Sequence, residues 1–165
     1  MRVLIVDDEP VSRRLLKRLL SRFPELDVRE AEDGEEAWAS LGDPIPGLIL
    51  CDLSMPRMDG TTFIKKVREH DLFGNIPVIV ISAANDRETL VGLKDLHILD
   101  YLLKPFNLVQ TFGRLERHLA PRIAEHRAAA RAASAAAARA AKAPAAAPGP
   151  ATTGGENTAE PSTGS

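Results

Sequence analysis

Val3–Pro10, which reads VLIVDDEP, is the stretch that decides the fold of this chain. Its four apolar residues, three of them β-branched, predict a short strand buried in a parallel sheet. Pro10 favours the first turn of a helix, because a proline there loses no hydrogen bond. Carboxylates thus follow at the carboxyl end of a strand, the edge where open α/β sheets bind ligands. For this stretch alone, the alternative is that Asp8 or Glu9 only caps the helix and Asp7 is a solvated loop residue.

A second apolar run also ends on a carboxylate. Leu48–Cys51 is followed by Asp52, then by the turn LSMPRMDG and a helical pattern. If this strand pairs with the first one, Asp7, Asp8 and Asp52 converge at one point of the sheet edge. The two strand ends together favour a binding site over a helix cap.

Three converging carboxylates require a compensating cation. Two unit charges about 4 Å apart repel by roughly 4 kcal/mol at an effective dielectric constant of about 20. Oxygen ligands with room for water and a phosphoryl oxygen suit Mg²⁺ better than zinc. The only thiol, Cys51, lies within the strand itself, where we interpret it as a small core residue. A single cysteine also excludes an intrachain disulfide.

Two further strands end on polar side chains. Val78–Ile81 runs into Ser82, and Tyr101–Leu103 runs into Lys104. Each side chain has an ordinary alternative, since Ser82 could cap a helix and Lys104 could be a solvated charge. Together, carboxylates, a hydroxyl and an ammonium group at four strand ends are typical of phosphoryl transfer, where a protein mainly positions groups and neutralises charge.

The remaining pattern alternates strand and helix. Residues 27–31 predict a strand, and the Asp33-Gly34 turn leads into a helix that carries Ala37, Trp38 and Leu41. We interpret Trp38 as packing rather than as a platform for a base. Inward-facing residues on the other predicted helices are Leu15, Leu16, Leu19, Leu20, Phe63, Ile64, Val67, Leu90, Leu93, Leu96, Phe112, Leu115 and Leu119. Five strands joined by helices require right-handed crossovers, which predicts an α/β fold with a doubly wound parallel sheet.

Residues 1–119 resemble a receiver domain of the two-component response regulator family. The motifs that carry the resemblance are Asp7-Asp8, Asp52, Met55-Pro56, Met58-Asp59-Gly60, Ser82-Ala83, Asp100-Tyr101-Leu102 and Lys104-Pro105-Phe106. The resemblance implies a flavodoxin-like, five-stranded parallel sheet of order 2-1-3-4-5 with helices on both faces.

The resemblance also implies the roles of the site residues. Asp52 is the expected phosphoacceptor, with Asp8 as a direct Mg²⁺ ligand and Asp7 acting through a coordinated water. The backbone carbonyl of Ser54 is expected to supply another metal ligand. Ser82 and Lys104 are expected to bind the phosphoryl oxygens. Tyr101 is expected to be the aromatic rotamer switch.

The expected function is a phosphorylation switch rather than an enzyme. A histidine kinase or histidine phosphotransfer protein would donate the phosphoryl group, and a downstream protein would bind the face of helix four, strand five and helix five. The alternative is a small phosphohydrolase of the haloacid-dehalogenase type. That class needs Asp-x-Asp at its first strand, where this chain has Glu9 in the second acidic position. A third possibility is an interaction domain that is never phosphorylated. It would not explain why acidic, hydroxyl and lysine side chains all occur at the strand ends.

One turn departs from the family pattern. The family usually has Gly-Ala before the last strand, whereas this chain has His97-Ile98. Glycine permits a positive φ angle that histidine adopts less readily, so the geometry of the output face is expected to differ. We interpret His97 as a turn residue at a helix end, with a pH-sensing or metal-binding role as the alternative.

Composition agrees with a cytoplasmic protein without a membrane span. The first apolar run is too short for a signal-peptide core, and a formal net charge of −2 argues against general nucleic-acid affinity. We expect a receiver domain at 1–120, an Ala/Arg-rich extension of helical composition at 121–143, and a disordered tail at 144–165. This leaves no room for a DNA-binding or enzymatic output domain.

The Ala/Arg-rich extension is interpreted as a solvated spacer. Arg127, Arg131 and Arg139 share one face of a helix, which would also suit nucleic acid or an anionic lipid surface. Because residues after Arg122 include no large apolar side chain except Ile123, a chain ending at Arg122 is expected to fold and react like the full chain.

Overall fold

The computed structural model describes residues 1–42, 44–83 and 93–141. Its centre is a five-stranded sheet of order β2-β1-β3-β4-β5, in which every neighbouring pair is parallel. The strands are β1 Arg2–Val6, β2 Asp27–Ala31, β3 Leu48–Asp52, β4 Val78–Ala83 and β5 Asp100–Lys104. The predicted flavodoxin-like sheet is therefore confirmed.

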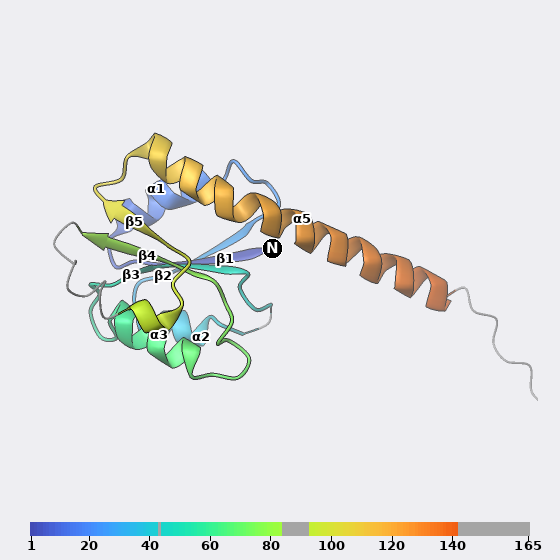
Figure 1. Ribbon diagram of the computed structural model, residues 1–165, viewed down its shortest axis with the longest axis horizontal. Coiled ribbons are helices and arrows are strands. Elements are labelled where there is room, and N and C mark those ends of the chain that lie inside the picture. The colour runs from blue at the N-terminus through green and yellow to red at the C-terminus, as the bar shows by residue number, and fades with distance from the viewer. Residues whose placement is uncertain (43, 84–92, 142–165) are drawn as a thin grey trace, which may run out of the picture. The chain divides into compact units, whose positions relative to one another are not determined.

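Helices cover both faces of the sheet. They are α1 Pro10–Leu20, α2 Gly34–Ala39, α3 Gly60–Arg68 and α5 Leu108–Ala141, with the short 3₁₀ helix η1 Lys94–Leu96 before β5. Figure 1 shows α1 and the start of α5 on one face, and α2 and α3 on the other. Alternate strand residues feed the two cores: Val3 and Ile5 pack with α1 and α5, whereas Leu4 and Val6 pack toward α2 and α3.

Two predicted helices differ in extent from the structure. α2 ends at Ala39, because the Ser40 hydroxyl bonds the Glu36 carbonyl at 2.9 Å and Ser40 closes the helix as its C-cap. Leu41 is therefore buried just beyond the helix rather than on it. Of the predicted fourth helix, Leu90 lies outside the described residues, and Leu96 belongs to η1.

Two single-residue predictions are confirmed. Trp38 packs against the core, with its ring edge-on to Phe73 and the Lys66 ammonium 4.1 Å from its centroid. Cys51 is fully buried, and burial raises the pKa of its thiol well above the ordinary value, so it is a core residue.

His97 takes the backbone conformation that a glycine would adopt easily. Its φ of 49° and ψ of 53° lie in the left-handed region directly after η1, as predicted for a turn residue at a helix end. The Arg68 guanidinium holds this turn by donating hydrogen bonds to the carbonyls of Leu96 at 2.7 Å and His97 at 3.3 Å.

The last helix is longer than the sequence indicated, and more of it packs against the domain. α5 continues through Pro121, and the compact unit that contains the sheet runs from Met1 to Ala130. Ile123 is only 7% exposed and belongs to the apolar core with Leu115. The Arg127 guanidinium pairs with the carboxylate of Glu25. A chain that ends at Arg122 would lack the buried Ile123, and its folding and reactivity stay a prediction.

The rest of the predicted division stays a prediction. Arg131–Ser165 forms a second unit, of which residues 131–141 are described and helical, and the tail predicted at 144–165 lies outside the described residues. Within the described ranges, every helix is too short or too polar to cross a membrane.

Candidate functional site

The structure brings the three predicted carboxylates together. β1 pairs with β3 so that Val6 lies beside Cys51, and the next residue of each strand is an aspartate. One carboxylate oxygen from each of Asp7, Asp8 and Asp52 lies within 4.8 Å of the other two. Asp7 and Asp52 are buried, whereas Asp8 is exposed. Such a cluster of oxygen ligands, open on one side, fits a hard divalent cation with bound water.

Lys104 reaches the same cluster from β5. Its Nζ lies 2.5 Å from Oδ2 of Asp52, 3.0 Å from Oδ2 of Asp7 and 3.7 Å from the Glu9 carboxylate. Burial lowers the pKa of Lys104, but hydrogen bonds and charges from Asp52 and Asp7 outweigh burial and raise that pKa overall. Lys104 therefore stays an ammonium ion.

For Asp7, the effect of burial on the pKa outweighs the effect of the neighbouring charges. Its side chain is completely buried, and burial raises its pKa above the ordinary value, although Lys104 and the Glu9 amide partly offset this. The Glu9 amide donates to Oδ1 of Asp7 at 2.9 Å and fixes the orientation of the carboxylate. Asp7 is thus a carboxylate whose charge depends on a nearby cation.

The turn after β3 holds Asp52 in place. The Ser54 amide lies 3.3 Å from Oδ1 of Asp52 and donates to it. Gly60 at the start of α3 donates to the Leu53 carbonyl at 3.0 Å, and a Cβ at Gly60 would clash with the carbonyl oxygen of Asp52. Only glycine therefore allows α3 to begin so close to the strand. The Asp59 carboxylate caps α3 by accepting from the Thr62 amide at 2.8 Å.

Ser82 offers a buried hydroxyl without an acceptor. Its side chain is fully buried on the central strand β4, and its Oγ has no hydrogen-bond partner among the described residues. Since buried hydroxyls are normally hydrogen-bonded, this one is suited to an oxygen that arrives with a ligand. Tyr101 lies on the neighbouring strand opposite Val80, half-buried against the core.

Glu9 joins the site although it is not among the residues that the sequence predicts to bind the metal or the phosphoryl group. It is the N-cap residue of α1, but its side chain makes no capping bond. Its carboxylate instead accepts from the Ser12 hydroxyl at 2.7 Å and faces Lys104. The run of three acidic residues after the first strand, Asp7-Asp8-Glu9, is the sequence feature that could have placed Glu9 at the site.

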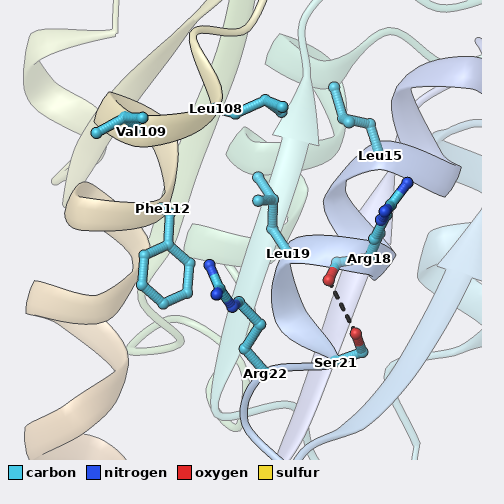
Figure 2. Close-up of a pocket in the computed structure, with 8 residues that line it drawn as sticks. All are labelled: Leu15, Arg18, Leu19, Ser21, Arg22, Leu108, Val109 and Phe112. Carbon is cyan, nitrogen blue, oxygen red and sulfur yellow. Dashed lines mark hydrogen bonds between the residues drawn. The ribbon is translucent and has the colours of Figure 1, made fainter.

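A separate hollow of about 640 Å³ lies between α1 and the start of α5 (Figure 2). It is lined by Leu15, Arg18, Leu19, Ser21, Arg22, Leu108, Val109 and Phe112. Leu15 was predicted to face the core but is only half-buried here, and the Arg22 guanidinium lies 4.8 Å from the ring centroid of Phe112. Because the hollow has no carboxylate and no acid-cluster residue, the chemistry belongs to the acid cluster rather than to this hollow.

Known proteins are similar to this chain in sequence. The family model of the response regulator receiver domain matches residues 3–116. Chemotaxis protein CheY1 of Helicobacter pylori is 36% identical over 107 residues, which are 64% of this chain and 86% of that protein. Sensor histidine kinase TmoS of Ectopseudomonas mendocina is 38% identical over 123 residues, which are 74% of this chain but only 12% of the kinase.

Solved structures agree in fold. A putative response regulator from Chloroflexus aurantiacus has a TM-score of 0.64 and 33% identity, covering 72% of this chain and 97% of that one. The phosphorylated cyanobacterial phytochrome response regulator RcpA has a TM-score of 0.63 and 30% identity, covering 70% of this chain and 91% of that one. From residue 3 to residue 116, this chain belongs to the response regulator receiver domain family.

Proposed function

We propose that Asp52 is the residue on which this receiver domain accepts a phosphoryl group. Receiver domains are phosphorylation-dependent signalling switches, and the family assignment gives this chain that function. The observation that supports Asp52 is its position: a buried carboxylate beside two other aspartates, with Lys104 Nζ at 2.5 Å. The carboxylate oxygen would attack phosphorus, and the donor's leaving group would take the electron pair of the broken bond.

Mg²⁺ is the proposed metal of the acid cluster. The residues that would hold it are Asp8 directly, Asp7 through a water, Asp52 itself and the backbone carbonyl of Ser54. The metal would neutralise charge on the phosphoryl oxygens. Its fit rests on the purely oxygen donor set of the three aspartates. The solved structure of response regulator Rcp1, 28% identical with a TM-score of 0.62, is a Mn²⁺-bound form.

Mg²⁺ binding should weaken with acid sooner than at an ordinary aspartate site. Burial raises the pKa of Asp7, so this carboxyl takes up a proton above the usual aspartate value of about 4, and the proton competes with the metal. Calorimetric titration with Mg²⁺ at decreasing pH measures the effect. Asp7→Asn should bind more weakly at neutral pH but respond less to pH; an unchanged pH profile in that variant would assign the effect to another group.

Lys104 and Ser82 are the proposed ligands of the transferred phosphoryl oxygens. Lys104 supplies a fixed positive charge, and the buried hydroxyl of Ser82, which has no partner among the described residues, supplies a hydrogen bond. When Ser82 turns toward the phosphoryl group, Tyr101 on the adjacent strand can move inward and change the surface.

Ser82→Ala should separate phosphorylation from the structural response. Asp52 and Lys104 remain, so the variant should still accept the phosphoryl group, but it loses the hydroxyl that connects the site to Tyr101. We expect phosphorylation-induced NMR shifts around Tyr101 to fall by at least half. Full-sized shifts in the variant would contradict the proposed coupling.

The proposed partners follow from the same chemistry. A histidine kinase or a histidine phosphotransfer protein would donate the phosphoryl group, and a downstream protein would bind the face built from the fourth helix, β5 and α5. β5 and the start of α5 are described, whereas residues 84–92 of that face lie outside the described residues.

The whole chain, incubated with acetyl phosphate and followed by intact-mass spectrometry, tests the proposed function. One phosphoryl group per chain, gained with Mg²⁺ and lost when the metal is chelated, is the expected result. Release of many phosphates per chain would support the haloacid-dehalogenase-type alternative, for which the family assignment gives no support. No covalent phosphate under any condition would overturn the proposal.

A further inference from the structure

The buried carboxylate of Asp33 makes two different kinds of interaction. It is the N-cap of α2, and its Oδ1 accepts from the amides of Glu35 at 2.7 Å and Glu36 at 2.9 Å. The side chain is completely buried, and its other oxygen pairs with the guanidinium of Arg57. The Arg57 side chain is 56% exposed, so the pair lies at the protein surface, where it links Arg57 to the start of α2.

The backbone of Arg57 adopts a conformation that is unfavourable for a residue with a side chain. It lies in the turn between Asp52 and α3 with a φ of 60°, in the left-handed region. A non-glycine residue there costs about 1 kcal/mol or more, and glycine would adopt the turn without that cost. The ion pair with Asp33 is the contact that a glycine at this position would lack.

The pair joins loops that follow the strands on either side of β1. Asp33 follows β2 and Arg57 follows β3, and the sheet order places β1, whose end carries Asp7 and Asp8, between those two strands. With strands about 4.8 Å apart, the ion pair joins loops that are two strand spacings from each other. The two loops lead into α2 and α3, which lie on the same face of the sheet (Figure 1).

A second link joins the same two loops. The Gly34 amide donates to the Met58 carbonyl at 3.0 Å, and a Cβ at Gly34 would lie only 2.7 Å from the Met58 side chain. The turn after β3 is therefore held at both ends, by Ser54 against Asp52 and by Arg57 and Met58 against the start of α2.

We propose that Arg57 and Asp33 form a clasp that positions the turn after β3, so that Arg57 is a positioning residue for Mg²⁺ binding and for phosphorylation of Asp52. This inference rests on the proposed function of Asp52 and adds to it a residue that touches neither metal nor phosphoryl group. The clasp keeps Ser54, whose amide bonds Asp52 and whose carbonyl is a proposed metal ligand, in its binding position before the metal arrives. Supporting residues of this kind change metal affinity by about 10- to 100-fold.

Arg57→Ala and Arg57→Gly in the whole chain test the clasp. Both remove the ion pair, but the glycine variant also relieves the left-handed backbone. We expect both to raise the Mg²⁺ dissociation constant measured by calorimetry about 10-fold, and to slow phosphorylation by acetyl phosphate by a similar factor. Exchange of the Gly34 amide with solvent in metal-free protein should become faster in both variants. Arg57→Lys should restore part of the affinity, because it keeps the charge but not the planar guanidinium.

The matched control removes the same charge elsewhere. Arg117 is exposed on α5 and has no ion pair among the described residues, so Arg117→Ala should bind Mg²⁺ like the wild type. Asp33→Asn combined with Arg57→Ala should bind Mg²⁺ no more weakly than Arg57→Ala alone, since both changes break one pair.

Three outcomes would overturn the clasp: wild-type Mg²⁺ affinity in Arg57→Ala, wild-type affinity in Arg57→Gly, or a lower melting temperature with unchanged affinity and rate. The wild-type result separates the two proposals. If wild-type protein gains no phosphoryl group while Arg57→Ala still weakens Mg²⁺ binding, the function proposed for Asp52 fails and the positioning role toward the metal stands.

Discussion

Asp52→Asn should abolish phosphorylation by acetyl phosphate, with no phosphoryl group detectable by intact-mass spectrometry. An amide has neither the charge nor the free oxygen nucleophile that attack on phosphorus requires. The neighbouring carboxylates are poor substitutes: Asp7 is completely buried and bound by Lys104, and Asp8 is an exposed residue of the following loop. The loss should therefore be complete rather than partial.

Asp59→Ala is the control for this loss. Asp59 belongs to the same turn but caps α3 and is not part of the acid cluster. Removing a cap of this kind costs about 1 kcal/mol, so the variant should melt earlier and still accept a phosphoryl group. Labelling of Asp52→Asn at the wild-type level would move the acceptor to another residue, which peptide mapping of the labelled variant would identify.

The buried strands and the carboxylates at their ends were predictable from local sequence signals, whereas the order of the strands followed from the family resemblance. Runs of four apolar residues marked the buried strands, and parallel strands end at the same edge, so Asp7 and Asp52 had to meet once β1 and β3 were neighbours. The need for an unusual turn at His97 also followed from a single position, since the family uses glycine there.

What the sequence did not show depends on contacts between distant residues. The pair of Arg57 and Asp33 joins two loops, and neither loop has a pattern that identifies its partner. Ile123 continues the spacing of four residues set by Leu115 and Leu119, but it follows Pro121, and the alanine-rich residues after it offer no further large apolar side chain. In the structure it packs in the same core as Phe23 and Leu26, which precede β2. The spacing of the apolar residues was therefore available for Ile123, but the continuation of the helix through Pro121 was not.

A chain that ends at Arg122 should be less stable than one that ends at Ala130 by about 2 kcal/mol. The shorter chain loses Ile123, and complete burial of an isoleucine side chain contributes about 1.5–3 kcal/mol. It also loses the pair of Arg127 with Glu25, but Arg127 is 58% exposed, so that pair contributes little. Urea unfolding of the two truncated chains and the full chain measures the difference.

Two point variants of the full chain separate packing from charge. Ile123→Ala should reproduce most of the loss, at about 2 kcal/mol or more, whereas Arg127→Ala should cost less than about 1 kcal/mol. Equal urea midpoints for the chains ending at Arg122 and Ala130 would show that the burial of Ile123 has no net effect on stability. Both truncated chains should still take up one phosphoryl group on Asp52 wherever they are folded, because Lys104 is the last residue of the site and it precedes α5. Residues 123–130 would then act on the stability of the domain and leave its chemistry unchanged.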